Sequence, residues 1–258
     1  MDGSRRGFLW LAGLTALGAA GAASLKALAQ HAEGPSVTVG LQGETRWAMV
    51  VDLDKFRLHK SWNRCIVACH RVHNVPSIPI KDDEIKWIWT EEFEKAFPSE
   101  EHEYVADRYR QLPVPVLCNH CNNPPCTRVC PTQATWKRAS DGIVMMDWHR
   151  CIGCRYCIVA CPYGSRSFNW RDPRPYIEGG AHRDFPTRMR GVVEKCTFCE
   201  ERLAKGLKPA CVEACEHGEL VFGNLEDPDS EVRQLLREHF TIRRKANLGT
   251  QPEVYYIV

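Results

Sequence analysis

Short apolar runs alternate with polar connections along this chain, and they predict a mixed fold of strands and helices. The run at residues 47–52 (Trp-Ala-Met-Val-Val-Asp) indicates a first buried strand. Residues 134–137 and 143–146 flank Asp141-Gly142, a pair typical of a β-hairpin turn. The strands are therefore expected to be short and joined by loops.

Further elements follow from the same pattern. The acidic stretch at residues 91–110 favours a helix, residues 220–222 a strand and residues 230–239 a second helix. The apolar residues 254–258 predict a final strand at the edge of a sheet. The basic residues between that helix and that strand, at 243–245, are expected to form a solvated face.

The N-terminal residues 1–30 have the features of a targeting segment. Arg5-Arg6 precedes an apolar run at residues 9–28, and Ala27-Leu28-Ala29 fits a cleavage site, so we predict a twin-arginine (Tat) export signal. The run is also nearly long enough to span a bilayer, which leaves an uncleaved anchor as the alternative. We expect the mature protein at the periplasmic face of the cytoplasmic membrane, with residues 31–45 as a linker.

Two runs of four cysteines, each ending in Cys-Pro, are the main chemical signal. The second run has the C-x2-C-x2-C-x3-C-P spacing of bacterial ferredoxins, in which three cysteines hold one [4Fe–4S] cube and the fourth reaches the partner cube. The first run is similar but has a longer middle loop. Crossing the two runs predicts two clusters, one on Cys118, Cys121, Cys126 and Cys161 and one on Cys151, Cys154, Cys157 and Cys130.

Composition and charge limit which cofactors and partners the protein can have. Fourteen cysteines in 258 residues are too few for a small disulfide scaffold, so metal is the better interpretation. Structural zinc also uses C-x2-C pairs and is the alternative, but the residue-by-residue match favours iron–sulfur clusters. The net charge of +2 provides no field that would draw the protein to nucleic acid.

The remaining cysteines predict a third cluster and one extra pair. The crossover rule places a cluster on Cys196, Cys199, Cys211 and Cys69. A fourth cluster would need ligands at His59 and Trp62, and tryptophan cannot bind iron. Cys65 and Cys215 should then face each other, and we predict a disulfide between them. A three-iron cluster on His59, Cys65 and Cys215 is the rival.

These assignments imply an α+β fold of tandem ferredoxin-like modules, with short hairpins and helices around the clusters, in a domain over residues 46–225. Its predicted parts are an inner module (113–170), an outer module (46–75 with 190–225), an insertion that acts as a flap or partner surface (76–112), and a C-terminal helix and tail (226–258).

Several motifs beyond the cysteines carry a family resemblance. They are the twin-arginine leader, the truncated Cys65-x3-Cys69 run, residues 85–92, residues 119–126 and residues 255–258. With them the chain resembles the four-cluster ferredoxin subunits that serve NrfD-type and molybdenum-reductase complexes, and in detail the DsrO-type periplasmic iron–sulfur subunits of the Dsr sulfite-reduction membrane complex. The resemblance implies an NrfD-type quinone-interacting membrane subunit, a periplasmic multihaem cytochrome c, and further membrane and cytoplasmic subunits as partners.

The function predicted from these observations is electron transfer rather than catalysis. The sequence has no evident nucleophile–base set, and a cube held by four thiolates offers no open position for a substrate. We expect single electrons to pass along three cubes between the membrane subunit and the cytochrome, in sulfite or sulfur metabolism. The alternatives are an electron-transfer subunit of a molybdopterin oxidoreductase or nitrite reductase, and a zinc-binding structural protein.

Overall fold

The computed structural model describes residues 45–100 and 107–258, and these described residues belong to one compact unit. The predicted export signal at residues 1–30 and the linker, apart from residue 45, lie outside the described residues. Within the described part of the chain, no helix has both the length and the apolar character needed to cross a bilayer.

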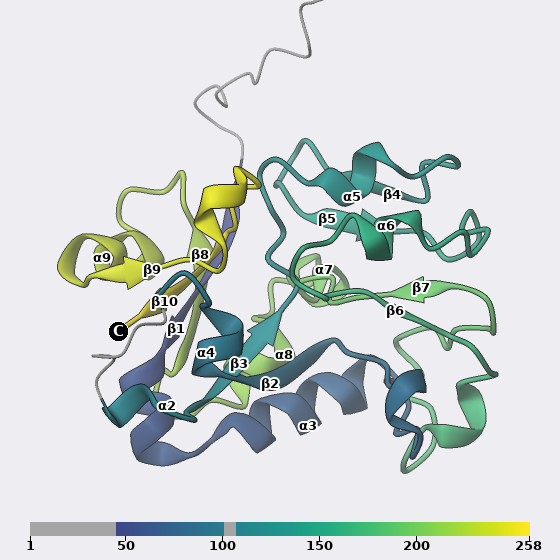
Figure 1. Ribbon diagram of the computed structural model, residues 1–258, viewed down its shortest axis with the longest axis horizontal. Coiled ribbons are helices and arrows are strands. Elements are labelled where there is room, and N and C mark those ends of the chain that lie inside the picture. The colour runs from purple at the N-terminus through teal and green to yellow at the C-terminus, as the bar shows by residue number, and fades with distance from the viewer. Residues whose placement is uncertain (1–44, 101–106) are drawn as a thin grey trace, which may run out of the picture. The chain divides into compact units, whose positions relative to one another are not determined.

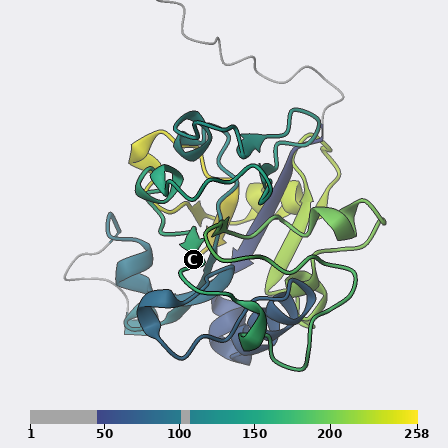
Figure 2. The same cartoon turned by 90° about the vertical axis from the view of Figure 1, so that its right-hand side faces the viewer.

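The largest sheet has four strands in the order β8-β1-β10-β9 (Figures 1 and 2). The strands are β1 (Trp47–Asp52), β8 (Leu220–Asn224), β9 (Thr241–Ile242) and β10 (Val254–Ile257). β1 pairs antiparallel with β8 and parallel with β10. The strands predicted at residues 47–52 and 220–222 are confirmed.

The edge position predicted for residues 254–258 is wrong. β10 lies inside the sheet, between β1 and β9. Val254 and Tyr256 are fully buried and Ile257 nearly so, so both faces of the strand are covered. The C-terminal segment is thus part of the core rather than a tail.

Two helices follow β1 directly. α2 (Leu53–His59) begins at Asp52, whose side chain accepts a hydrogen bond of 2.9 Å from Lys55 N, and it ends at the left-handed Lys60. α3 (Trp62–Val72) then packs against the short α8 (Ala210–Glu213), which follows α7 (Glu200–Leu203).

The inner module is built from very short elements: β3 (Pro113–Leu117), α5 (Pro125–Arg128), β4 (Thr135–Lys137), β5 (Val144–Met146), α6 (Tyr156–Val159) and β6 (Ser167–Phe168). β4 and β5 form the predicted hairpin, with Thr135 opposite Met146. β6 pairs with β7 (Val193–Glu194), and α5 contacts α6. Loops therefore supply most of the module.

The insertion is attached to the inner module by a strand pair. It contains η1 (Lys81–Asp83), β2 (Ile88–Glu92), α4 (Phe93–Ala96) and η2 (Asp107–Tyr109), and β2 pairs antiparallel with β3. The helix predicted over residues 91–110 is wrong in its described part. The strand runs to Glu92, and the helix that follows stops before Pro98, whose ring cannot continue it.

The C-terminal segment contains the predicted helix, α9 (Glu231–Glu238), capped by Ser230, whose hydroxyl accepts a hydrogen bond of 3.3 Å from Arg233 N. The solvated face expected at residues 243–245 is wrong for Arg244. Its side chain is buried and donates a hydrogen bond of 3.3 Å to the carbonyl of Ala96. Two further single turns are η3 (Arg174–Tyr176) and η4 (Ala246–Leu248).

Candidate metal centres

The structure brings together the first predicted ligand set, which we call site 1: Cys118, Cys121, Cys126 and Cys161. Three of these cysteines come from α5 and the loop between β3 and α5, and Cys161 follows α6. Burial raises the pKa of Cys121 to about 12, and the charges of Cys118, Cys126 and Cys161 also act on it. The two cysteine runs therefore meet at this point, as the crossover requires.

Site 2 consists of Cys130, Cys151, Cys154 and Cys157, which line one small cavity together. Three of the four are partly exposed, so this site lies near the surface. Burial acts to raise the pKa of Cys130, but hydrogen bonds from the Thr135 backbone and the Thr132 side chain outweigh it and lower the pKa. The thiolate that a metal needs is thus favoured at Cys130.

A glycine turn shapes the loop of site 2. Gly153 has φ +71°, and a Cβ at this position would lie 2.4 Å from the carbonyl oxygen of Gly191. No other residue fits there without moving the backbone.

Site 3 consists of Cys69, Cys196, Cys199 and Cys211, all of which are buried. Cys69 lies on α3, Cys211 lies on α8, and the other two precede α7. Burial raises the pKa of Cys69 well above its usual value, and the charges of Cys211, Cys199 and Cys196 add to this effect. Bringing four thiolates together here is unfavourable unless a cationic group binds them.

The donor atoms of the three sites fit iron–sulfur clusters. Thiolates are soft, strongly donating ligands, and a cubane takes four of them. Backbone N–H groups also point at the sulfurs of site 3, from Phe198 to Cys196 and from Ala210 to Cys199, each at 3.4 Å. Such hydrogen bonds to ligand sulfur help to set a cluster's reduction potential.

The three sites form a row with site 1 in the middle. The charge of Cys118 acts on Cys196, which links site 1 to site 3. Cys126 and Cys157 belong to one buried apolar cluster and also interact by charge, which links site 1 to site 2. Ligands of neighbouring sites are therefore close enough to interact by charge.

Cys65 and Cys215 form a disulfide in the structure, with a Cα–Cα distance of 6.1 Å. The bond joins α3 to the residues after α8, where a fourth ligand set would have been. His59, named in the rival three-iron assignment, stacks instead on His217 with ring centroids 4.0 Å apart. With both thiols bonded to each other, the described residues offer no three-ligand set at this position.

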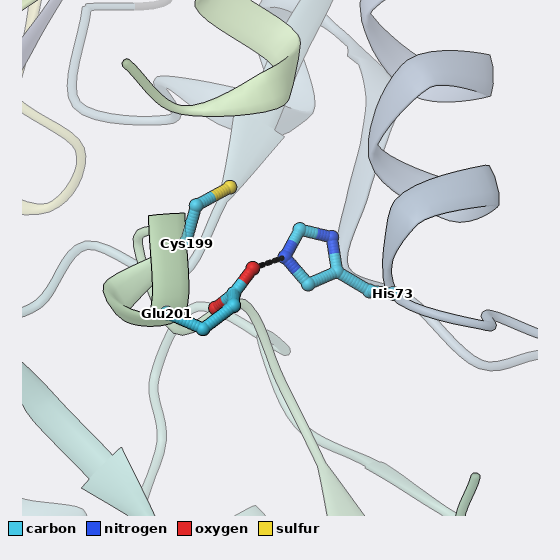
Figure 3. A group of neighbouring side chains, drawn as sticks. All are labelled: His73, Cys199 and Glu201. Carbon is cyan, nitrogen blue, oxygen red and sulfur yellow. Dashed lines mark hydrogen bonds and ion pairs between the residues drawn. The ribbon is translucent and has the colours of Figure 1, made fainter. Parts of the chain in front are cut away.

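A histidine and a carboxylate lie beside site 3 (Figure 3). His73 Nε2 is 3.0 Å from Glu201 Oε1, and His73 Nδ1 is 2.8 Å from the carbonyl oxygen of Cys69. Trp87 stacks on the His73 ring at 4.7 Å. His73 thus connects the backbone of the site 3 ligand Cys69 with Glu201 and with Trp87 of the insertion.

Sequence reasoning missed the charged residues buried around the sites. Arg188 and Glu194 form an ion pair of 2.7 Å with both side chains fully buried, and Arg188 also donates to the carbonyl of Asn74 at 2.9 Å. Arg166 and Lys195 are buried beside the cysteines of site 1. Arg166, Arg188 and Lys195 lie on connections and Glu194 lies on the two-residue strand β7, so none of them belongs to a periodic pattern; the only signal was that Lys195 immediately precedes Cys196.

Comparison with known proteins agrees with the geometry. The model of a 4Fe-4S dicluster domain matches residues 110–174 and 183–225, which include the ligands of all three sites except Cys69. The Hdr-like menaquinol oxidoreductase iron-sulfur subunit 1 of Archaeoglobus fulgidus is 41% identical, over 98% of this chain and 97% of its own length.

Two further relatives cover most of both chains. The menaquinone reductase iron-sulfur cluster-binding subunit of Nitratidesulfovibrio vulgaris is 37% identical over 82% of this chain and 88% of its own. The arsenate respiratory reductase iron-sulfur subunit ArrB of a Shewanella species is 35% identical over 82% of this chain and 96% of its own. The chain therefore belongs to the family of iron–sulfur electron-transfer subunits with 4Fe-4S dicluster domains, whose members serve menaquinol oxidoreductases and molybdenum reductases.

Proposed function

We propose that this protein carries single electrons along three [4Fe–4S] clusters, in the order site 2, site 1, site 3, within a membrane-bound respiratory complex. The observation that carries the proposal is the row itself: twelve cysteines form three groups of four, and ligands of neighbouring groups interact by charge. Clusters bound there would supply one-electron redox chemistry, and the chain's residues supply their spacing and burial.

The surface at site 2 supports contact with an apolar partner. Ile152, Tyr156 and Val159 lie among the site 2 cysteines and are 65%, 63% and 87% exposed. Apolar side chains gathered around a redox site are typical of an interface. We assign this surface to the quinone-interacting membrane subunit, of the NrfD type, because site 2 lies nearest the surface.

Substitution at this surface tests the assignment. Val159→Asp should release the protein from its membrane complex on solubilisation and purification, while leaving iron content unchanged. Phe240→Asp is the matched control, because Phe240 is 76% exposed but lies between α9 and β9. Retention of Val159→Asp, or equal release of both variants, would refute the docking assignment.

The opposite end of the row has a different surface. A groove of about 670 Å³ lies between α3 and α8, near Cys69 and Cys211. Its lining contains valine and alanine side chains, and Arg64, Arg71 and Arg202 also line it. Arg64 and Arg202 pair with Glu216 and Glu213. We assign this end to the soluble partner, a periplasmic multihaem cytochrome c, because charged surfaces favour transient redox encounters.

The proposal also includes a cellular compartment and a metabolic role. The twin-arginine motif supports export to the periplasmic face, and the Cys65–Cys215 disulfide is consistent with an oxidising compartment. We propose a role like that of the DsrO-type subunits, in sulfite or sulfur metabolism. Replacing Arg5 and Arg6 by lysine should retain the protein in the cytoplasm; unchanged export would exclude the signal.

One alternative has an observation in its favour, namely the similarity to the iron–sulfur subunit of the arsenate respiratory reductase. In that case the chain would serve a molybdopterin-dependent reductase. Molybdenum measured in the intact purified complex separates the two proposals, because the complex proposed here contains none.

The decisive experiment counts clusters. Anaerobically purified protein should contain about 12 iron and about 12 acid-labile sulfide per chain, with EPR signals of reduced cubanes only. About 16 iron would mean that a fourth cluster forms despite the disulfide. Zinc without iron would overturn the proposal altogether.

A further inference from the structure

Two buried cations lie among the cysteines of the central site. Arg166 is 4% exposed and Lys195 is fully buried. In the described residues, neither has a carboxylate within ion-pair distance, although an isolated buried charge is costly. Their counter-charge must therefore come from elsewhere.

Arg166 lies between sites 1 and 2. Its Nη2 donates to Cys126 Sγ at 3.1 Å and to Thr135 Oγ1 at 2.9 Å, which fixes the guanidinium against a site 1 ligand. Its charge also acts on Cys157 of site 2, where it opposes the effect of burial on the thiol. An arginine stays protonated in any protein environment, so this charge is permanent.

Lys195 occupies the matching position between sites 1 and 3. Its Nζ donates to the carbonyl of Val144 and, at 2.8 Å, to the carbonyl of Cys196. Burial lowers the pKa of Lys195, and the charge of Arg166 acts in the same direction, whereas the charges of Cys118 in site 1 and Cys196 in site 3 favour the charged form. Each step of the row thus has one buried cation beside it, and site 1 is flanked by both.

We propose that Arg166 and Lys195 are positioning residues that hold the extra negative charge a cluster at site 1 acquires with each electron. This inference rests on the proposed electron-transfer function. A cluster that gains one electron and no proton becomes more negative by one unit, and a nearby desolvated cation stabilises that state. The two residues therefore raise the reduction potential of the central cluster, which makes the transfer of an electron into site 1 from either neighbouring site more favourable.

The expected size of the effect follows from Coulomb's law. At an effective dielectric constant of about 20, a unit charge several ångströms away changes a one-electron equilibrium by about tenfold or more. An exposed charge at similar separation is screened by water and by salt, and has much less effect.

The test measures potentials rather than activity. Arg166→Gln should lower the equilibrium constant for reducing the site 1 cluster by about tenfold, equivalent to about 59 mV for one electron, in an EPR-monitored redox titration with dithionite. The site 1 signal is identified as the one altered by Cys121→Ser. Arg166→Lys should restore most of the potential, because it keeps the charge.

Arg155→Gln is the matched control, because Arg155 is exposed yet adjacent to Cys154 of site 2. It should change every potential by less than about threefold, since water screens it. If Arg166→Gln, with full iron content, also leaves every potential within threefold, the inference is wrong while the proposed function stands.

A second variant is needed in case the first variant loses its iron. If Arg166→Gln fails to retain iron, Lys195→Met carries the same expectation for site 1. Loss of the site 1 cluster in both variants would show that the two residues are structural, which overturns the electrostatic role. Wild-type protein without clusters would instead refute the proposed function itself.

Discussion

The protein contains two helix pairs beside its metal sites, an inner pair formed by α5 and α6 and an outer pair formed by α3 and α8. The two pairs are held together in different ways. In the inner pair, α5 and α6 are four residues long each, and these helices and the loops beside them provide the ligands of sites 1 and 2. In the outer pair, α3 is eleven residues long, and a disulfide stands where a further ligand set would be. The outer pair thus has one ligand set, to which α3 contributes Cys69 and α8 contributes Cys211, and a disulfide in place of the second set.

The local sequence explains why the outer pair departs from the inner one. Ser61 and Trp62 begin α3 where an inner loop would wrap around a cluster, and Trp62 packs against the main core. A helix places residues 65 and 69 on one face, four positions apart. Cys65 therefore reaches Cys215, and Cys69 reaches site 3.

The largest effect is expected from removing the fourth ligand of a site, which comes from a different part of the chain than the other three. This ligand is Cys69 in site 3 and Cys130 in site 2. Cys69→Ser and Cys130→Ser should each lower iron from about 12 to about 8 per chain. Because the disulfide still holds α3 on α8, Cys69→Ser should lower the thermal unfolding temperature less than Cys130→Ser does. Calorimetry together with iron analysis checks this; a larger loss of stability in Cys69→Ser would contradict the contrast.

The second-largest effect is expected from breaking the buried Arg188–Glu194 ion pair. Arg188 also holds the end of α3 through its hydrogen bond to the carbonyl of Asn74. Arg188→Met leaves the Glu194 carboxylate buried without its partner and should reduce the free energy of unfolding by about 3–5 kcal/mol. Arg150→Met in the inner module is the control, because the Arg150–Asp147 pair is exposed and worth about 0–1 kcal/mol. Denaturant unfolding followed by circular dichroism measures both, and equal costs would refute the assignment.

The disulfide should affect stability but not metal content. The double change Cys65→Ser with Cys215→Ser should lower the free energy of unfolding by about 2–4 kcal/mol, because it frees a long loop in the unfolded chain. Iron should remain at about 12 per chain. A drop in iron would mean that the two cysteines contribute to a cluster.

The smallest effect is expected at the start of α3, where the Ser61 hydroxyl donates to the buried Glu219 carboxylate. Burial acts to raise the pKa of Glu219, but this hydrogen bond and backbone N–H groups lower it overall. A lowered carboxylate pKa stabilises the fold above the unfolded-state pKa, and the contribution is lost as pH falls through the folded-state value.

Ser61→Ala should therefore cost about 1 kcal/mol at pH 7. The difference from wild type should shrink on acidification towards pH 4. Ser230→Ala, at the start of α9, should cost about 1 kcal/mol without this pH dependence. A Ser61→Ala cost that does not change with pH would show that Glu219 is not the partner that matters.

The cysteine spacing predicted the grouping into sites because three ligands of each cube come from one stretch of the chain and the crossover rule supplies the fourth. Cys65 and Cys215 followed from the same counting. The continuous apolar run of β1 and the Asp141-Gly142 turn were equally informative, since both signals are local.

Features that depend on distant partners could not be predicted. Residues 91–110 have a helical composition, but pairing with β3 makes residues 88–92 a strand. Arg244 and Arg166 look like ordinary surface arginines in the sequence, and only the fold buries them. β10 was recognised as a strand, yet its position beside β1 depends on chain topology.

The parallel pairing of β1 with β10 also sets the timing of folding during synthesis. The two strands are separated by about 200 residues, and a ribosome adds roughly 5–20 residues per second. β1 therefore waits on the order of ten seconds or more for its neighbour. A product terminated early, before residue 254, would lack the strand that joins β1 to β9, and would expose a long unpaired edge to chaperones and proteases.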